Sequence, residues 1–569
     1  MNPDIVIKAD QFGVQFPSTD RPTLSKIDLQ IHRGEVTLLM GPSGCGKSVL
    51  LYCMNAVVPD IFDARIEGEL SVLGKKVLER HVSEMGRHVG MVFQDPESQF
   101  AMLDVQSDVA FGLENLALDR DEMRSRIRKT VDLMGLQAIE KKAVWQLSGG
   151  QKEKVVFASI LAMEPEILLL DDPCANLDPT TTNAIFQIVK TMRERGVTVV
   201  MVEHKVDEFI ELVDRVVIMD DGRTVLDGSP REIFEKHGSR IKRELGLWIP
   251  QMSELELEKR KKRNAAGFFP LTVKEALGVF ARYDYLAGKF VRKAPQAQEL
   301  VVDVEDLQFY YPDGTHALKG ANLKVRKGSI TALLGANGSG KTTLALHLIG
   351  ILKPSSGRGI VCGMDIKKTP AKELTKRVSQ VFQNPEHQFI KTTVFDEMAF
   401  SLHTMKADER TIKDRVDELL SMLGLGGLQD RHPASLSGGQ KRRLSVAVMM
   451  IMNPDLLILD EPTYGQDEKN TRLMLDFFRD RVRQLGSTVL MITHDMKVVI
   501  EYAEEVAVMS GGTTIYSGTP EDLFLKQEIL EKANLSQPPL SRLVVDLNAL
   551  GKGISPGIRS IDDFVGLIK

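Results

Sequence analysis

The sequence predicts an α/β protein in which one kind of domain occurs twice. Three observations support this fold class: a long internal repeat, apolar runs of strand length that alternate with helical patterns, and a glycine-rich loop after one such run in each copy. The apolar runs include 36–40, 167–170 and 198–202, and the helical patterns include 183–195 and 206–212. Short apolar runs between helices are typical of strands in a mainly parallel, buried sheet. Residues 301–325 instead alternate apolar and polar positions, which favours antiparallel strands.

The repeat is visible as a series of motifs that recur in the same order. GPSGCGKS at 41–48 returns as GANGSGKT at 335–342, and LSGGQK at 147–152 returns unchanged at 436–441. The segments VFQDPESQF, LLLDDP and VEH, at 92–100, 168–173 and 202–204, have counterparts at 381–389, 457–462 and 492–494. An ordered set of matches at nearly constant spacing indicates a duplicated domain.

The repeat places one domain at 1–235 and a second at 300–525. Residues 236–299 are then a linker or C-terminal extension of the first domain, and residues 526–569 are a tail. The basic run at 259–263 is interpreted as a solvated linker, with a nucleic-acid or lipid contact as the alternative. In the tail, Leu540, Leu543, Val544 and Leu547 have the spacing of one small packed helix.

Composition excludes several classes of protein. With 43% hydrophobic residues, 27% charged residues and a net charge of -5, the chain of 569 residues is unlike a generally basic nucleic-acid binder. No apolar stretch approaches the roughly 18 residues of a membrane helix, and the N-terminus lacks the features of a signal peptide. Cys45, Cys53, Cys174 and Cys362 have neither metal-site nor disulfide spacing. We therefore expect a cytosolic chain with any membrane role peripheral.

Each glycine-rich loop follows an apolar strand, precedes a helical pattern and fits the P-loop G-x-x-x-x-G-K-[ST]. Its glycines let backbone N–H groups surround phosphates, and the helix N-terminus adds positive potential. Lys47 and Lys341 are expected to reach the β- and γ-phosphates of ATP, and Ser48 and Thr342 to hold Mg²⁺. The predicted nucleotide-binding residues are Gly41, Pro42, Ser43, Gly44, Cys45, Gly46, Lys47 and Ser48, with Gly335, Ala336, Asn337, Gly338, Ser339, Gly340, Lys341 and Thr342.

A second acidic element accompanies each loop. Asp171 and Asp460 each end an apolar run and therefore project from the carboxyl end of a buried strand. There they can organise the shell of a Mg²⁺ ion. A capping aspartate without a metal role is the alternative, which the neighbouring P-loop makes less favourable.

LSGGQ at 147–151 and 436–440, shortly before each acidic strand end, resembles the signature of the ABC ATPase superfamily. Nearly all of both repeats takes part in this resemblance, with the family's motifs in family order twice. It implies two P-loop NTPase domains, each with a RecA-like mainly parallel core, an antiparallel β subdomain and a helical signature subdomain. It also implies that the two domains pair within one chain.

The resemblance assigns roles to further residues. Gln94 and Gln383 resemble the Q-loop glutamines that sense Mg²⁺ and the attacking water, and His204 and His494 resemble switch histidines. Asp178 and Asp467 resemble D-loop residues. Phe16 and Tyr311 resemble the aromatic residue that stacks on adenine, with core packing as the alternative. The signature residues Ser148, Gly149, Gly150, Ser437, Gly438 and Gly439 are implied to close over the ATP that the other repeat binds.

The two sites differ at the residue that polarises the attacking water. In the second repeat it is Glu461, as the family expects, whereas in the first it is Asp172, which is one methylene shorter. A carboxylate displaced by about 1 Å can cost on the order of 100-fold in rate. We hypothesise that the site using Lys341 and Glu461 hydrolyses faster; the alternative is that a small backbone shift restores the first site.

QDPESQF and QNPEHQF resemble a segment of the energy-coupling factor (ECF) ATPases, which drive uptake of vitamins or of cobalt and nickel. This resemblance implies two kinds of partner: an integral T-type membrane protein, whose helices sit in grooves beside these segments, and a substrate-binding membrane subunit. The chain would then lie at the cytoplasmic face of the membrane.

The competing class is a tandem ABC ATPase that acts on ribosomes or nucleic acid. The translation-factor type has a long, charged helical linker, the recycling type a cysteine-rich region and the DNA-repair type zinc modules, and this sequence has none of these features. A fused sugar-importer ATPase is a further alternative, but its second copy is usually more degenerate. We expect no nucleic-acid partner.

Overall fold

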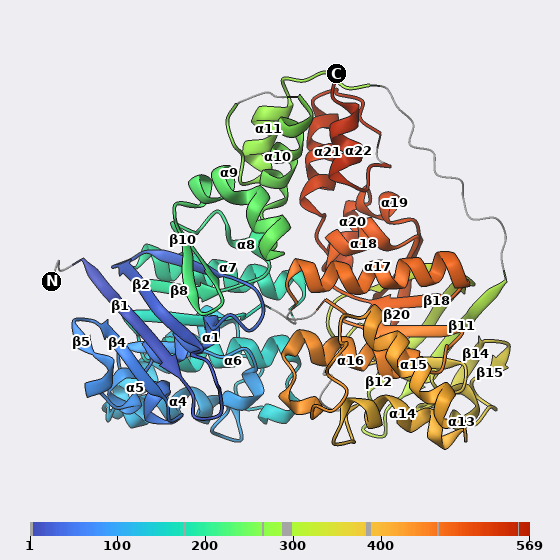
Figure 1. Cartoon of the computed structure of the whole chain (residues 1–569), viewed down its shortest axis with the longest axis horizontal. Coiled ribbons are helices and arrows are strands. Elements are labelled where there is room, and N and C mark those ends of the chain that lie inside the picture. Colours follow the sequence, from blue (N-terminus) through green and yellow to red (C-terminus); the bar gives the residue numbers. More distant parts are fainter. Residues whose placement is uncertain are drawn as a thin grey trace. The chain divides into compact units, whose positions relative to one another are not determined.

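The computed structural model describes residues 4–174, 177–263, 267–286, 299–382, 388–463, 466–555 and 557–569. The chain divides into two compact units, residues 1–257 with 269–272 and residues 258–268 with 273–569. Within the described ranges, each unit contains a six-stranded and a four-stranded sheet (Figure 1). The predicted duplication of an α/β fold is therefore confirmed.

The six-stranded sheet of the first unit carries the loops of the site. Its order is β10-β9-β3-β8-β7-β6, and all neighbouring pairs are parallel except β9 and β10. The strands are β3 (Val36–Met40), β6 (Val89–Val92), β7 (Ile167–Asp171), β8 (Thr198–Val202), β9 (Arg215–Asp220) and β10 (Arg223–Gly228). Every residue of β3, β7 and β8 is buried, as expected for parallel strands covered on both faces. Parallel strands end at one edge, so the residues that follow these three strands gather there.

The four-stranded sheet of the first unit is antiparallel, with the order β2-β1-β4-β5. Its strands are β1 (Ile5–Gln15), β2 (Leu24–His32), β4 (Arg65–Val72) and β5 (Lys75–Lys76). Alternate residues of β2 are buried and exposed, because this sheet packs on the core with one face only.

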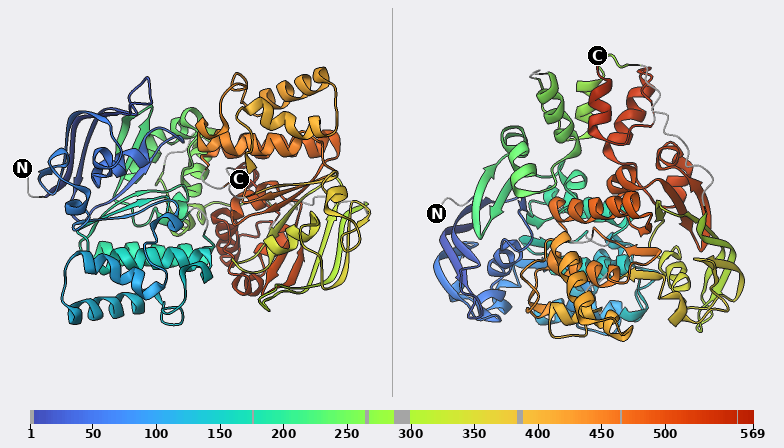
Figure 2. Two further views of the ribbon diagram at one scale, coloured as in Figure 1. Left: turned by 90° about the horizontal axis from the view of Figure 1, so that it is seen from below. Right: turned by 45° about the vertical axis from the view of Figure 1, so that its right-hand side comes forward.

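Helices cover the first unit's sheets and form a separate helical group. The helices are α1 (Lys47–Met54), α2 (Val57–Asp60), α3 (Val82–Met85), α4 (Val105–Asn115), α5 (Arg120–Met134), α6 (Gly149–Ala162), α7 (Pro179–Glu194), α8 (Val206–Phe209) and α9 (Pro230–Arg240). Figure 2 shows α4, α5 and α6, blue to cyan, packed together. This group is the helical signature subdomain that the resemblance implies. The α7 helix starts four residues before the predicted 183–195, because Asp178 caps it and Pro179 occupies its first turn.

The second unit repeats these sheets. Its six-stranded sheet has the order β16-β17-β18-β13-β19-β20, and its antiparallel sheet has the order β12-β11-β14-β15. The strands are β11 (Leu300–Tyr310), β12 (His316–Arg326), β13 (Ile330–Leu334), β14 (Ser356–Val361), β15 (Met364–Asp365), β16 (Val378–Val381), β17 (Leu456–Asp460), β18 (Thr488–Ile492), β19 (Glu505–Ser510) and β20 (Thr513–Gly518). β11 and β12 confirm the antiparallel pattern predicted for 301–325.

The second unit has helices that correspond to those of the first. They are α12 (Lys341–Leu348), α13 (Ala371–Leu374), α14 (Val394–Thr404), α15 (Glu409–Met422), α16 (Gly438–Met450), α17 (Glu468–Leu485), α18 (Met496–Tyr502) and α19 (Pro520–Phe524). In this unit α14, α15 and α16 form the helical group. None of the helices among the described residues is long and apolar enough to cross a bilayer.

The basic run at 259–263 is solvated only in part: residues 261–263 are exposed, but Lys259 is buried. It lies in helix α10 (Gln251–Arg263), and Lys259 is 1% exposed, with its ammonium group over the rings of Phe280 and Tyr283. Lys262 pairs with Asp562, and Arg263 donates to the backbone carbonyls of the last two residues. The aromatic rings and carboxyl-terminal carbonyls that accept these cations come from distant parts of the sequence, so charge patterning alone missed the contacts.

The tail contains more structure than the single predicted helix. Leu540, Leu543, Val544 and Leu547 are buried on α21 (Pro539–Ala549), as predicted, and α20 (Gln527–Lys532) and α22 (Ile561–Leu567) accompany it. Helix α11 (Val273–Phe280) packs on α21 (Figure 1). The ring of Phe280 meets the ring of Phe564 from α22 edge-on. The segment before the second repeat and the tail therefore form one small helical module of the second unit.

Candidate active site

The P-loop of the first unit runs from β3 into α1 and curls around a lysine. Gly44 and Gly46 have φ angles of 84° and 100°, in the left-handed region that favours glycine. The buried ammonium group of Lys47 donates to the carbonyl oxygens of Gly41 at 2.7 Å and Pro42 at 3.0 Å. The loop thus has the shape of a phosphate cradle with a cation at its centre.

The P-loop of the second unit, between β13 and α12, has the same geometry. Gly338 and Gly340 have φ angles of 76° and 101°. Lys341 donates to the carbonyl oxygens of Gly335 at 2.7 Å and Ala336 at 2.9 Å. The two cradles are therefore built alike, although their sequences share only the glycine and lysine framework. The other predicted loop residues lie in the same two segments, and their ligand contacts stay predictions.

Strands β7 and β17, each two strands away from its P-loop strand in the sheet, end in a carboxylate. In the first unit the hydroxyl of Ser48 donates to Asp171 Oδ1 at 3.0 Å. Burial raises the pKa of Asp171, while Ser48 and Lys47 oppose that rise. Burial also raises the pKa of Asp460, opposed by Arg442 and Lys341. The hydroxyl and carboxylate oxygens in the first unit suit the oxygen preference of Mg²⁺, so this geometry fits the predicted ion.

The residue after each of these aspartates has an unusual backbone. Asp172 and Glu461 have φ angles of 50° and 48°, in the left-handed region that costs a non-glycine residue free energy. Their amides donate to Val202 O and Ile492 O, in each case at 2.9 Å. The turn is therefore built alike in both units.

In the second unit the switch histidine and the predicted catalytic acid are neighbours. His494 Nε2 lies 3.4 Å from Glu461 Oε1 and 3.1 Å from Asn337 Oδ1 of the P-loop. The backbone N–H of His494 also donates to Glu461 Oε2 at 3.3 Å. Three residues far apart in the sequence therefore meet where the γ-phosphate of ATP is expected.

The corresponding place in the first unit is more acidic. Burial, followed by the charge of Asp171, raises the pKa of Asp172 to about 6. Burial, followed by Asp172, raises the pKa of Glu203 to about 7. Glu203 Oε1 accepts hydrogen bonds from the amides of His204 and Lys205. His204 is half-buried at the end of β8, close enough to Asp171 to lower the pKa of its carboxyl.

Each signature motif begins a helix. Ser148 and Ser437 cap α6 and α16, accepting hydrogen bonds from the amides of Gln151 and Gln440. Gly149 and Gly438 have open space where a Cβ would be, so their backbone can be approached closely. A Cβ on Gly150 would lie 2.9 Å from the Thr181 hydroxyl, and one on Gly439 would lie 3.1 Å from Gln466 Oε1. The second glycine of each pair thus packs on the start of α7 or α17.

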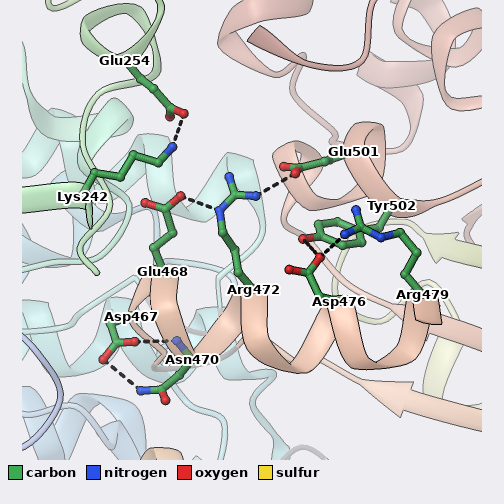
Figure 3. A network of polar contacts seen from close by, with 10 residues as sticks. All are labelled: Lys242, Glu254, Asp467, Glu468, Asn470, Arg472, Asp476, Arg479, Glu501 and Tyr502. Carbon is green, nitrogen blue, oxygen red and sulfur yellow. Dashed lines mark hydrogen bonds and ion pairs between the residues drawn. The ribbon is translucent and has the colours of Figure 1, made fainter. Parts of the chain in front are cut away.

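The D-loop aspartates are also helix caps. Asp178 accepts from Thr181 N, and Asp467 accepts from both the backbone and the side-chain amide of Asn470 (Figure 3). In the next turn of α17, Arg472 bridges Glu468 and the Glu501 carboxylate of α18. The sequence motif located both aspartates, but these supporting ion pairs are specific to the second unit, where Pro179 and Asn183 are replaced by Glu468 and Arg472.

The predicted adenine-stacking residues are half-buried beside their P-loops. Phe16 packs against the core cluster of the four-stranded sheet. The Tyr311 hydroxyl lies 3.1 Å from Thr343 Oγ1, one residue after the P-loop, and its ring meets Phe309 edge-on. Adenine stacking stays a prediction for both.

The Q-loop glutamine of the first unit, Gln94, is exposed at the end of β6, whereas Gln383 lies outside the described residues. Sequence reasoning missed the role of the second glutamine in the same segment. Gln99 accepts from Phe93 N at 2.8 Å and donates to Met91 O at 3.0 Å, so it holds the segment against β6. The recurrence of this glutamine in both repeats was the available signal.

Comparisons with known proteins identify this architecture. Residues 24–175 and 318–464 match the family described as ABC transporter. A candidate ABC transporter ATP-binding protein of Methanosarcina mazei is 37% identical over 100% of this chain and 98% of its own length. A candidate HMP/thiamine import ATP-binding protein of Bacillus subtilis is 37% identical over 94% of this chain and 96% of its own. The chain belongs to the ABC transporter family as an ATP-binding protein, and it is an ATPase.

A solved structure is also similar in sequence. It is cbiO1 from Clostridium perfringens, described as part of the ABC transporter complex cbiONQ. It is 37% identical, covers 44% of this chain and 100% of its own, and has a TM-score of 0.39.

Proposed function

We propose that this chain is the ATP-hydrolysing subunit of an ECF-type importer, coupling ATP hydrolysis to uptake of a vitamin or a transition-metal ion through separate membrane subunits. The observation that carries this proposal is a large groove on the first unit, described below, that can receive a helix of a membrane protein. The relative named for HMP/thiamine import and the two ECF-like segments support the importer type.

In the proposed hydrolysis step, the P-loops hold the phosphates and the acids after the strand ends activate water. Lys341 neutralises phosphate charge, and Glu461 orients and polarises the attacking water with His494 beside the γ-phosphate. Bound Mg²⁺, held by the P-loop hydroxyl and the strand-end aspartate, would supply a charge that stabilises the phosphate oxygens. The pairing of each signature motif with the nucleotide of the other repeat stays a prediction.

The groove has a volume of about 1290 Å³ and lies between the antiparallel sheet and the helical group of the first unit. Phe111 and Leu116 of α4 and Met163 after α6 supply apolar lining, and Arg87, His88 and Glu166 supply charge. Mixed apolar and charged lining suits an amphipathic helix. We propose that a cytoplasmic helix of a T-type membrane protein binds here, with the chain peripheral to the membrane.

Strand β6 and one ion pair connect this groove to the ATP-binding edge of the sheet. Arg87 and His88 lead directly into β6, whose other end starts the Q-loop segment. In that segment Glu97 pairs with Lys152 of the signature helix at 2.5 Å. A movement of the docked helix can therefore be passed through β6 to the signature motif, as rigid-body coupling requires.

The test is purification of the tagged full chain from membranes. We expect it to bring down a multi-helix T-type protein and a second, substrate-binding membrane subunit, both identified by mass spectrometry. Phe111→Glu should lose both subunits while the isolated chain keeps its ATPase activity, because the charge blocks an apolar contact outside the P-loops. Leu133→Glu is the matched control, since Leu133 is exposed but does not line the groove.

Two outcomes would contradict the proposal. One is retention of the membrane subunits by Phe111→Glu. The other is co-purification of ribosomal particles or nucleic acid in their place, which would favour the competing class of soluble tandem ABC ATPases.

The hypothesis of unequal sites has its own test. Glu461→Gln should reduce ATP turnover by about tenfold or more, whereas Asp172→Asn should reduce it by about twofold or less. Steady-state phosphate release by the full chain measures both. Equal losses would show that the first site turns over as fast as the second.

A further inference from the structure

A buried arginine of the signature helix contacts the catalytic turn of the second unit. Arg442 is 2% exposed, and its guanidinium group donates to three backbone carbonyls. The acceptors are Phe382 O at 2.5 Å, Asp460 O at 2.6 Å and Glu461 O at 2.7 Å. Phe382 follows β16 and Asp460 ends β17, so one side chain ties the start of the Q-loop to the turn that carries Glu461.

Several contacts hold the turn at Glu461. Its φ of 48° is in the left-handed region, which persists in a glutamate only when surrounding contacts enforce it. The amide of Glu461 is held by Ile492 O and its carboxylate by His494. Arg442 holds the remaining backbone group, the carbonyl, and charge-assisted hydrogen bonds of this kind are stronger than neutral ones.

The first unit has an acidic residue at the equivalent position. Glu153 stands two residues after the signature glutamine, as Arg442 does, and it is 4% exposed. A carboxyl group has at most one donor, and only when protonated, so it cannot hold several carbonyl oxygens of the matching turn as a guanidinium group does. Burial, followed by Asp172, raises the pKa of Glu153 to about 8. The catalytic acid of the first unit is therefore accompanied by a further acid where the second unit has a cation.

We infer that Arg442 is a positioning residue for ATP hydrolysis, which fixes the backbone of Glu461 so that its carboxylate meets the attacking water. The exchange of this arginine for Glu153 removes the same support from Asp172. This inference rests on the catalytic role predicted for Glu461, and it is independent of the proposed importer partners because it concerns the isolated chain.

The test compares ATP turnover by variants of the full chain. Arg442→Met should lower kcat by about tenfold, with KM for ATP within about twofold, since the nucleotide-binding loop is untouched. Arg442→Lys, which keeps a cation with three donors, should recover part of the loss. Arg415→Met is the matched control. Arg415 lies on α15 and also donates to a backbone carbonyl, that of Ile451, but this carbonyl is not part of the catalytic turn, so the variant should keep full kcat.

A double-mutant cycle separates positioning from general destabilisation. If Arg442 acts through Glu461, adding Arg442→Met to Glu461→Gln should cause little further loss of kcat. Losses that multiply in the double variant, or a kcat of Arg442→Met equal to that of the intact chain, would overturn the inference. A full effect of Glu461→Gln in the same assay shows that the underlying role of Glu461 holds.

Loss of folding by Arg442→Met does not end the test. In that case Arg442→Gln, which keeps two amide donors, takes the place of the methionine variant and is compared with Arg442→Lys. Partial rescue by lysine relative to glutamine, at equal thermal stability, is the result expected for positioning. Equal kcat values for lysine, glutamine and the intact chain would overturn the inference.

Discussion

Single residues decide how the two sites differ. The positions of Asp172, Glu203 and Glu153 in the first unit are taken by Glu461, Thr493 and Arg442 in the second. All three acids of the first unit are buried and have raised pKa values. The surroundings of Asp172 are therefore acidic, whereas Glu461 has an arginine and a threonine at the corresponding positions.

The acid cluster makes the stability of the first unit dependent on pH. The pKa of Glu153 rises from 4.5 to about 8 on folding. Its contribution to the free energy of unfolding is therefore full below about pH 4.5 and is lost as pH rises through about 8. Glu153→Gln does not titrate, so it should gain stability over the intact chain by about 1 kcal/mol or more between about pH 5 and 8.

Chemical denaturation of the nucleotide-free full chain at several pH values measures this difference. A gap between the two proteins that stays constant across that pH range would contradict the prediction.

At the scale of elements, the signature helices are placed by close packing as much as by capping. Ser148 and Ser437 cap α6 and α16, and the second glycine of each motif lies against the helix that follows the D-loop. The first glycine of each motif has open space instead. In each motif the second glycine therefore fixes where the signature helix packs. The first glycine leaves the backbone accessible to a ligand.

This difference predicts opposite effects for neighbouring substitutions. Gly150→Ala puts a Cβ 2.9 Å from Thr181 Oγ1, and threonine is stiff at χ1, so the packing must shift. We expect Gly150→Ala to be less stable than Gly149→Ala by about 1 kcal/mol or more, because overpacking outweighs the gain in helix propensity. Thermal unfolding compares the two; equal midpoints would show that Thr181 rotates without cost.

At the scale of the whole molecule, the chain presents two P-loops of equal geometry on one polypeptide. Both lysines are buried, and each donates to the first two carbonyls of its own loop. The small module of α11, α21 and α22 belongs to the second unit, so these described parts of the segments outside the repeats are packed structure.

Two equal cradles predict two nucleotides per chain. Equilibrium dialysis of the intact chain with ATP and Mg²⁺ should give a stoichiometry of about two, and Lys47→Ala or Lys341→Ala alone should give about one, because each lysine supplies phosphate charge in its own loop. The double variant should neither bind ATP nor release phosphate. Undiminished binding by the double variant would contradict the assignment of both loops.

The sequence by itself determined the duplication, the α/β class and the position of each motif, because loops of this kind need fixed glycines and fixed spacing. The fully buried β3 and β8 have the predicted bounds, since their mostly apolar runs are of strand length. Capping moved the start of α7, and the ring of Phe280 packs against Lys259, the first residue of the basic run.

Only the tertiary structure decided what surrounds the catalytic acids. Arg442 and Glu153 are charged residues shortly after a signature motif, and nothing in their local pattern marks them as buried. Their effect depends on the carbonyls and carboxylates that the sheet edge brings to them from distant strands. Burial of a charge is a property of the assembled fold, and it is therefore the part of the site that spacing along the chain could not predict.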